Sequence, residues 1–344
     1  MGGPTPRVAA ARSALADLDL PAGSAVLVAC SGGADSLALA ATLGHVAPRR
    51  GWRAGAVVVD HALRPSSADD AAAAAAACRA LGLPAEVRTV AVPGGARGTG
   101  HGGPEAAART ARYAALEEAA AGPGAVVLLG HTMDDQAETV LLRLARGSGA
   151  RSLAGMAPAT ARFRRPFLAL RRADTRGICA DLGLTPIEDP SNAADGDWVR
   201  ADGGPLLRSA VRHTALPALV EALGPGVVPA LARTAAQLRR DAELLEDLAG
   251  AALERALRGR GPGRVDVDAA TLAAEHPALR TRVLHRLLVE TSGTGGAYAA
   301  RHVDAVDRLV TDYHGQGAAD LPGLTARRSG GTIVLTKGNG HGRR

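Results

Sequence analysis

Short apolar runs and helical patterns alternate over the first part of the chain. The apolar runs have the length of β-strands and lie at 25–30, 54–59, 85–92 and 125–130. Helical patterns separate them at 36–46, 68–81 and 105–121, and a further helix begins close to Asp134. This alternation predicts an α/β fold, with a parallel sheet that carries helices on both faces.

The alternation ends after about residue 215, and long helical stretches follow it. They lie at 229–258, 276–291 and 298–313. Near the C-terminus a pair of glycines separates two apolar runs, 324–328 and 332–336, as in a β-hairpin. We therefore expect an α/β domain over 1–217 and a mainly helical domain with a terminal hairpin over 226–337. The glycine-rich stretch 93–104 predicts a surface loop.

The composition excludes several classes of protein. Of 344 residues, 47% are hydrophobic and 22% are charged, which excludes intrinsic disorder. No apolar run reaches the roughly 18 residues that span a bilayer, and the N-terminus lacks the apolar block of a signal peptide, so we expect a cytoplasmic protein without a membrane partner. The three cysteines are dispersed and predict neither disulfides nor a Cys-x-x-Cys site.

The net charge of +6 points to a partner of opposite charge. Lys337 is the only lysine, so arginine supplies almost all of the 40 basic residues. A GC-rich genome accounts for the excess of alanine, glycine and arginine, but it does not account for the positive sign. A positive excess fits a polyanion such as nucleic acid.

A glycine-rich turn, Ser31-Gly32-Gly33-Ala34-Asp35-Ser36, joins the first predicted strand to a helix. At such a place the backbone N–H groups and the helix dipole can hold a phosphate, and serine hydroxyls can donate further hydrogen bonds. The alternative is a serine-capped helix after a glycine turn. No lysine follows the glycines, so this is not the Walker A loop.

Polar residues also follow the second predicted strand. Asp60 and His61 lie at the carboxyl edge, where open α/β sheets bind ligands, although a plain strand-end turn would look the same. On the helix at 105–121, Arg109 and Arg112 share a face at i, i+3.

The string 129–139 (LGHTMDDQAET) follows the fourth predicted strand. If its helix begins near Asp134, then Asp134 and Glu138 share a face at i, i+4 and His131 lies at its mouth. Such carboxylates suit Mg²⁺ when it also binds phosphate oxygens. The alternative is a helix capped by Thr132 or Asp134, and capping does not exclude metal binding.

These motifs together resemble a known family. The string 31–36 resembles the SGGxDS signature of the PP-loop ATP pyrophosphatases, which cleave ATP between the α- and β-phosphates and adenylate a substrate. The order of the remaining motifs resembles one branch, the tRNA(Ile)-lysidine synthetases, in their short form: 60–64, 105–113, 129–139, 146–149, 155–156, 165–168, 188–192 and 208–213. The likeness is strong over 25–217 and weaker over 229–336.

The resemblance implies a ligase that uses ATP and Mg²⁺. In this branch the C2 carbonyl oxygen of the wobble cytidine, in the CAU anticodon of an isoleucine tRNA, attacks the α-phosphorus of ATP. Free L-lysine then displaces AMP through its ε-amine to give lysidine. Lysine's ammonium must lose a proton first, and Asp135, Asp60 and Glu138 are all candidate acceptors. Arg112 and Arg64 are candidates for its carboxylate.

The resemblance assigns the candidate residues as follows. Catalytic residues are Asp35, Asp60, His131, Asp134, Asp135 and Glu138. Residues that bind ATP are Ser31, Gly32, Gly33, Ala34, Asp35, Ser36, Asp60, His61 and Gly130. Residues that bind the substrates are Arg64, Arg109, Arg112, Arg208 and Arg212. Residues that bind Mg²⁺ are Asp35 and Asp134. Contacts to tRNA phosphates are expected from the arginines at 162, 164, 165, 171, 172 and 176.

Two departures from the branch and two alternatives stay open. Ser209 stands where the branch has asparagine, and residues 201–207 look inserted. Another PP-loop enzyme, such as a 2-thiocytidine synthase, would rely on paired cysteines, and a non-catalytic tRNA-binding module would not need the full set of carboxylates. The sequence leaves the oligomeric state open, with a homodimer as one outcome.

Overall fold

The computed structural model describes residues 3–92, 103–147, 149–188, 206–293 and 298–338. Its internal contacts divide the chain into two compact units, Met1–Arg239 and Arg240–Arg344. This division lies later than the boundary that the sequence places between residues 217 and 226. The reason is that the first turns of helix α10 (Val227–Ala256) belong to the first unit, where Val228 packs with Ala137 and Leu216.

The first unit is built on a five-stranded parallel sheet with the order β3-β2-β1-β4-β5. Its strands are β1 (Ala25–Ala29), β2 (Arg53–Asp60), β3 (Ala85–Thr89), β4 (Val126–Leu128) and β5 (Phe163–Arg164). Val26 of the central strand lies opposite Ala54 on one side and Val126 on the other. The first four strands confirm the prediction, whereas β5 has only two residues and shows no alternation in the sequence.

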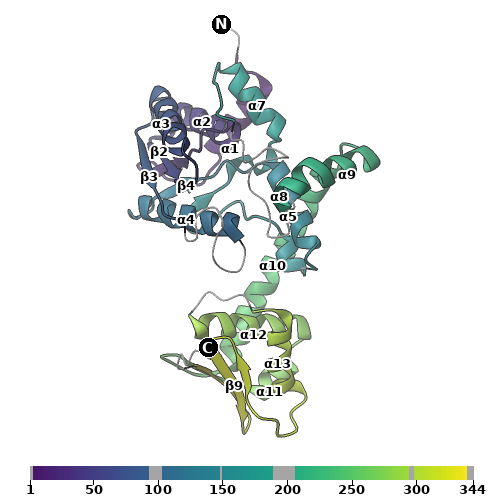
Figure 1. Ribbon diagram of the computed structural model, residues 1–344. Coiled ribbons are helices and arrows are strands. Elements are labelled where there is room, and N and C mark those ends of the chain that lie inside the picture. The colour runs from purple at the N-terminus through teal and green to yellow at the C-terminus, as the bar shows by residue number, and fades with distance from the viewer. Residues whose placement is uncertain (1–2, 93–102, 148, 189–205, 294–297, 339–344) are drawn as a thin grey trace. The chain divides into compact units, whose positions relative to one another are not determined.

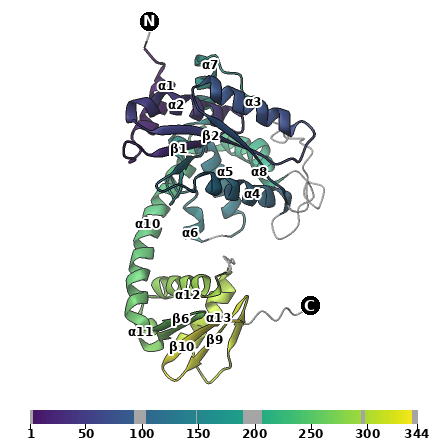
Figure 2. The same cartoon turned by 90° about the vertical axis from the view of Figure 1, so that its left-hand side faces the viewer.

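Helices cover both faces of this sheet, as predicted (Figures 1 and 2). Val26 and Val28 point to the face that carries α1 (Pro6–Ala16), α2 (Ala34–Arg50), α3 (Ser67–Ala80) and α7 (Arg172–Asp181). Val57 and Val127 point to the opposite face, which carries α4 (Gly103–Ala119). Because successive side chains of a strand point to opposite faces, each strand contributes to both cores.

The strand order reverses at β1. The chain passes from β1 outward to β2 and β3 and then returns to place β4 on the other side of β1. In open parallel sheets, ligands bind in the crevice outside the carboxyl ends of the strands at such a reversal. The turn 31–36 follows β1 and the string 129–139 follows β4, so the two strongest motifs of the sequence meet at this crevice.

Shorter helices complete the first unit. They are α5 (Met133–Leu144), α6 (Ala150–Leu153), the 3₁₀-helix η2 (Pro166–Ala169), α8 (Leu207–Ala210), the π-helix η4 (Val211–Ala215) and α9 (Leu216–Leu223). In the described part of the chain no single helix has the length and apolar character to cross a membrane; Leu207–Leu223 and Val227–Ala256, bent by 102°, reach it only as a pair.

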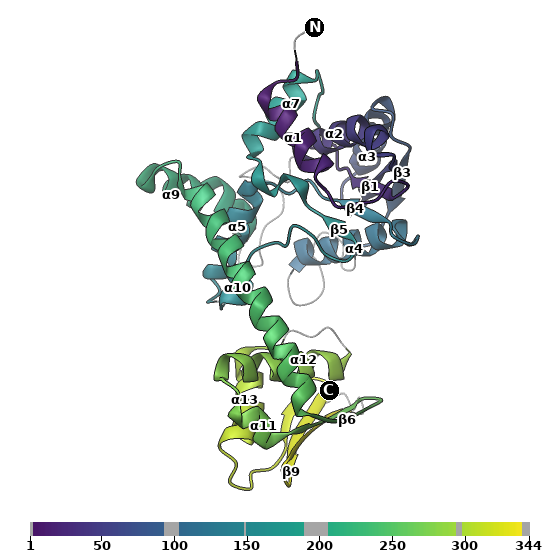
Figure 3. The same ribbon diagram turned by 180° about the vertical axis from the view of Figure 1, so that it is seen from behind.

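The second unit holds an antiparallel sheet with the order β6-β7-β10-β9-β8, packed against helices (Figure 3). The elements are β6 (Leu257–Gly261), β7 (Arg264–Asp268), α11 (Ala269–Ala274), α12 (Pro277–Ser292), α13 (Ala300–Thr311), β8 (Ala319–Leu321), β9 (Leu324–Ser329) and β10 (Thr332–Lys337). The predicted helices and the predicted β9–β10 hairpin are present. The hairpin belongs to a larger sheet than the sequence indicated, because β6 and β7 add a second one.

Candidate functional site

The turn after β1 has the geometry of an anion-binding helix N-terminus. Gly32 has a φ of +83°, and a Cβ there would lie 2.5 Å from Cδ1 of Ile187, so only glycine fits. Gly33 is the N-cap of α2 and offers no side-chain cap to the first-turn N–H groups. These N–H groups and the positive end of the helix dipole therefore suit a phosphate.

The two serines of this turn differ in what they can offer to a ligand. The Ser36 hydroxyl is buried; it donates to the carbonyl oxygen of Gly33 at 3.0 Å and accepts from the N–H of Ser31 at 3.1 Å. Its proton thus shapes the turn, which corrects the expectation that it donates to phosphate. Ser31 is exposed, and its hydroxyl lies 3.3 Å from that of Ser36. Ser31 is the serine better placed to donate to a bound anion.

Gly130 brings the second motif against this turn. A Cβ at Gly130 would lie 2.9 Å from the carbonyl oxygen of Asp35 and 3.1 Å from the backbone nitrogen of Ser36. These neighbours are backbone atoms of the first turn of α2, so no side chain fits between them. The end of β4 therefore reaches the phosphate turn only because residue 130 is glycine.

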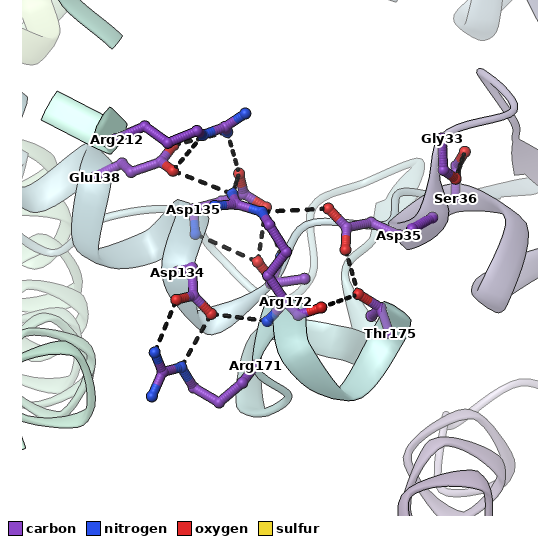
Figure 4. A network of polar contacts seen from close by, with 12 residues as sticks. Gly33, Asp35, Ser36, Asp134, Asp135, Glu138, Arg171, Arg172, Thr175 and Arg212 are labelled. Carbon is purple, nitrogen blue, oxygen red and sulfur yellow. Dashed lines mark hydrogen bonds and ion pairs between the residues drawn. The ribbon is translucent and has the colours of Figure 1, made fainter. Parts of the chain in front are cut away.

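Asp134 is occupied by a neighbouring arginine. Its two carboxylate oxygens accept from Nε and Nη2 of Arg171 at 3.0 and 2.9 Å, and one of them also accepts from the backbone N–H of Arg172 at 2.8 Å (Figure 4). Burial opposes this charge, but Arg171 and Arg172 outweigh it and lower the pKa of Asp134. Such a bidentate pair is a strong charge-assisted contact.

Asp135 and Glu138, one turn apart on α5, share three arginines. Arg172 donates to both carboxylates, at 2.8 and 3.1 Å. Arg212 donates to Glu138 at 2.7 and 3.0 Å and to Asp135 at 3.2 Å, and Arg208 donates to the same pair at 3.0 and 3.2 Å. Glu138 is fully buried. The acids and arginines form one ionic network that joins α5 to α7, α8 and the π-helix.

The network fixes the ionisation of the residues inside it. Burial raises the pKa of Asp135, but Arg172, Arg208 and the N–H of Thr132 outweigh burial and lower it to about 2. Burial lowers the pKa of His131 to about 3; nearby arginines act in the same direction and Asp135 opposes them. At neutral pH, Asp135 is therefore an anion and His131 is neutral. Asp135 also completes a capping box with Thr132, so capping and a charged role coexist at this helix start.

The predicted Mg²⁺ ligands fit only in part. Asp35 lies in the first turn of α2, beside the phosphate turn, and its carboxylate accepts a hydrogen bond from the Thr175 hydroxyl. Both oxygens of Asp134 already accept from Arg171, so the expectation that Asp134 binds the metal does not fit this geometry. In the part of the chain that the structure describes, no three His, Cys, Asp or Glu side chains gather as a ready-made cation site. A cation here would need one carboxylate and phosphate oxygens, an arrangement that Mg²⁺ accepts.

Asp60 differs from the other acids because no ion pair to a described residue is found for it. It is buried at the end of β2, and one of its oxygens accepts from the N–H of Ala62 at 2.8 Å. Ala62 has a φ of +50°, a turn conformation that this hydrogen bond supports. Arg64, two residues on, pairs with Asp70 at 3.2 Å. His61 lies beside them at the same sheet edge.

The two predicted arginines of α4 gather around one aromatic ring. The guanidinium carbons of Arg109 and Arg112 lie 4.9 and 5.8 Å from the centre of the Tyr113 ring. Arg109 also donates to the Tyr113 hydroxyl at 3.2 Å, and the ring packs edge-on against Phe163 of β5. Cation–π contacts of this kind hold guanidinium groups in place without neutralising them.

Comparison with known families now adds to this geometry. A family model described as a PP-loop domain matches residues 7–217, and one described as the TilS substrate binding domain matches residues 268–334. A tRNA(Ile)-lysidine synthase of Thermobifida fusca is 52% identical over 341 residues, covering 98% of this chain and 99% of the relative. The chain belongs to the tRNA(Ile)-lysidine synthase family.

Other relatives agree with this placement. The tRNA(Ile)-lysidine synthase of Streptomyces coelicolor is 50% identical, covering 93% of this chain and 87% of the relative. Among solved structures, the U34-tRNA thiolase NcsA from Methanococcus maripaludis, which holds a [4Fe-4S] cluster, has a TM-score of 0.56 at 18% identity and covers 68% of this chain and 78% of its own. The likeness to the thiolase shows a common fold.

The lysidine synthase site contains residues that the sequence assigned differently or missed. Arg171 and Arg172 were expected on tRNA phosphates, but they bind carboxylates. Arg208 and Arg212 were expected on substrate, but their described partners are Asp135 and Glu138. Thr175 was missed, although its i, i+3 spacing from Arg172 was a usable signal.

Some predicted features lie outside the described residues. These are most of the glycine-rich stretch, residues 93–102, most of the motif at 188–192, and residues 201–205 of the inserted segment. Ser209 lies in α8, between the two turns that carry Arg208 and Arg212.

Proposed function

We propose that this protein ligates free L-lysine to C2 of the wobble cytidine in the CAU anticodon of isoleucine tRNA. ATP is converted to AMP and pyrophosphate, and the modified anticodon reads AUA instead of AUG. Family membership over nearly the whole chain supports the reaction. The observation that carries it is the uncapped N-terminus of α2, with Gly32, Gly33 and Asp35 at the reversal of the strand order.

The phosphate turn supplies the donors that nucleotide activation needs. Backbone N–H groups of Gly33, Ala34 and Asp35, with the Ser31 hydroxyl, would hold the β- and γ-phosphates as they leave. Asp35 would hold Mg²⁺ together with phosphate oxygens, and the bound ion would neutralise charge on the pyrophosphate leaving group. Donors that are already oriented need no reorganisation as this charge develops.

The second step requires a base for the ε-ammonium of lysine. Of the three candidates from the sequence, Asp135 and Glu138 are held by arginines, and Asp135 has its pKa near 2. A carboxylate held in this way is a poor proton acceptor at neutral pH. We therefore assign the proton to Asp60. Arg112 and Arg64 are our candidates for the carboxylate of lysine.

Thiolation is the alternative reaction, and nothing in the described residues favours it. Cys30, Cys78 and Cys179 are all buried. Burial raises the pKa of Cys179 to about 11, which keeps it a thiol. A persulfide carrier needs an accessible thiolate.

The decisive experiment uses unmodified isoleucine tRNA with Mg·ATP, with and without lysine. We expect AMP release and lysine incorporation at the wobble cytidine, each dependent on ATP and tRNA. Asp35→Ala should abolish turnover while circular dichroism and thermal unfolding stay near wild type. Incorporation of sulfur instead of lysine, or full turnover by Asp35→Ala, would overturn the assignment.

Two further parts of the proposal concern the setting of the reaction. We propose that the enzyme acts in the cytoplasm, where tRNA, ATP and free lysine occur together, and that it needs no membrane. We also propose a homodimer, which sedimentation equilibrium of the full chain would test. A single species at the mass of one chain would contradict the dimer.

A further inference from the structure

A buried threonine contacts the carboxylate of the phosphate turn. Thr175 lies on α7 and is 0% exposed. Its hydroxyl donates to Oδ1 of Asp35, which is 140 positions earlier in the chain (Figure 4). The contact therefore joins α7 to α2 at the point where a nucleotide would bind.

The hydroxyl has two acceptors within reach and one proton to give. The other acceptor is the carbonyl oxygen of Arg172, at 2.9 Å. A carboxylate is the stronger acceptor because a hydrogen bond to an ionised group is shorter and about twice as strong. The proton therefore belongs to Asp35.

The carboxylate of Asp35 is held from two sides. Thr175 binds Oδ1, and Nε of Arg172 lies 3.7 Å from Oδ2. The longer contact provides charge without a fixed hydrogen bond. The orientation of the carboxylate thus depends on Thr175, whose β-branched side chain is itself restricted at χ1.

We propose that Thr175 is a positioning residue that holds the Asp35 carboxylate in the orientation needed for Mg·ATP. Thr175 itself touches neither nucleotide nor tRNA. The inference rests on the proposed function, since it gives Thr175 a role only if Asp35 serves the nucleotide. The family assignment does not require it.

The first test separates the hydroxyl from the shape of the side chain. Thr175→Val keeps the shape and removes the hydroxyl, whereas Thr175→Ser keeps the hydroxyl. We expect Thr175→Val to lower kcat and raise the KM for Mg·ATP, with about a tenfold loss in kcat/KM, which is the low end for a hydrogen bond to a charged group. The KM for lysine should stay constant, and Thr175→Ser should recover most of the loss.

Thr42→Val is the matched control. Thr42 is 4% exposed on α2, and its hydroxyl donates to the carbonyl of Ala38 at 2.7 Å, within the same helix. This change removes an equally buried hydroxyl that does not reach Asp35. It should leave the KM for Mg·ATP and kcat near wild type. Equal kinetic losses in Thr175→Val and Thr42→Val would overturn the inference.

A second test measures binding rather than turnover. Calorimetry gives the affinity for Mg·ATP of the wild type, Thr175→Val, Asp35→Asn and the double variant. If Thr175 acts through Asp35, Thr175→Val weakens binding about tenfold in the wild type and less than twofold in Asp35→Asn. Independent, multiplying losses would overturn the inference. Thr175→Ala replaces Thr175→Val in the cycle if the valine variant does not fold.

The outcomes distinguish this inference from the proposed function. If Asp35→Asn binds and turns over ATP like the wild type, the role of Asp35 fails, and the proposed function loses its main support. If Asp35→Asn loses binding while Thr175→Val keeps it, only the role of Thr175 fails.

Discussion

Gly130 is a position where a single methyl group would disturb the nucleotide site. A Cβ there meets two backbone atoms of the first turn of α2, at 2.9 and 3.1 Å, and backbone cannot move aside as a flexible side chain can. We expect Gly130→Ala to cost about 1–3 kcal/mol of unfolding free energy and to weaken Mg·ATP binding by more than tenfold. Urea unfolding and calorimetry measure the two effects.

Gly122 provides the control for this prediction. No atom lies within 4 Å of a Cβ at Gly122, so Gly122→Ala should leave both quantities near wild type. Wild-type ATP affinity in Gly130→Ala would mean that the turn after β1 is not the nucleotide site.

His131 makes the stability of the protein depend on pH. Burial lowers its pKa to about 3, while an unfolded histidine titrates near 6.5. Between these values the unfolded chain binds a proton that the folded chain does not, so stability falls as the pH falls below about 6.5. The slope contributed by this residue is at most about 1.4 kcal/mol per pH unit.

The measurement is urea unfolding at pH 7 and at pH 5. We expect the wild type to lose up to about 2 kcal/mol more over this interval than His131→Gln. His314→Gln should behave like the wild type, because the His314 side chain is 82% exposed. An equal loss in wild type and His131→Gln would show that His131 accepts a proton in the folded state.

At the scale of residues, the sequence identifies the contacts that are local in the chain. The glycines of the phosphate turn and the acids of the string 129–139 stand in short strings whose types and spacing already indicate their chemistry. The arginine partners do not, because Arg171 reaches Asp134 across 37 positions and Arg212 reaches Glu138 across 74. Those pairs exist only once α7 and the π-helix pack against α5.

Helix α5 holds the π-helix through Glu138. This carboxylate is fully buried and accepts from Arg172, Arg208 and Arg212. Glu138→Gln leaves three cationic groups with one anion fewer, and we expect it to cost about 3 kcal/mol of unfolding free energy. We also expect faster hydrogen exchange of the backbone amides at 206–215.

Glu118→Gln is the control on another helix. Glu118 is 75% exposed on α4 and lies 3.6 Å from Arg88, so its loss should change neither stability nor exchange. Unchanged exchange at 206–215 in Glu138→Gln would show that the ionic network does not hold the π-helix.

At the scale of elements, long and periodic segments were predictable and short ones were not. Strand β5 has two residues, and β6 is rich in arginine and glycine, so neither shows a strand pattern. Helix α1 was missed although a signal was present: its buried residues Val8, Ala11 and Leu15 recur at helical spacing after Pro6.

The whole molecule depends on arginine for its positive charge. Lys337 is the only lysine among 40 basic residues, and it ends strand β10. If tRNA binding uses this charge, acetylation of Lys337 and the N-terminal amine should leave tRNA affinity within about twofold, since at most one or two phosphate contacts are lost. Phenylglyoxal, which modifies guanidinium groups, should abolish binding.

Filter binding before and after each treatment measures this difference, with far-UV circular dichroism as the check on folding. A salt titration supports it, because contacts to phosphates make the logarithm of the affinity fall linearly with the logarithm of salt concentration. A large loss of binding on acetylation would contradict a surface that works through arginine.

The scarcity of lysine has a practical consequence for spectroscopy. A protein with a single lysine, placed at the end of a strand, adds almost no background to a magnetic resonance experiment on isotope-labelled lysine. Substrate labelled at the ε-nitrogen can therefore be followed inside the intact enzyme, and its chemical shift on approach to the adenylated base reports directly whether the amine has lost its proton.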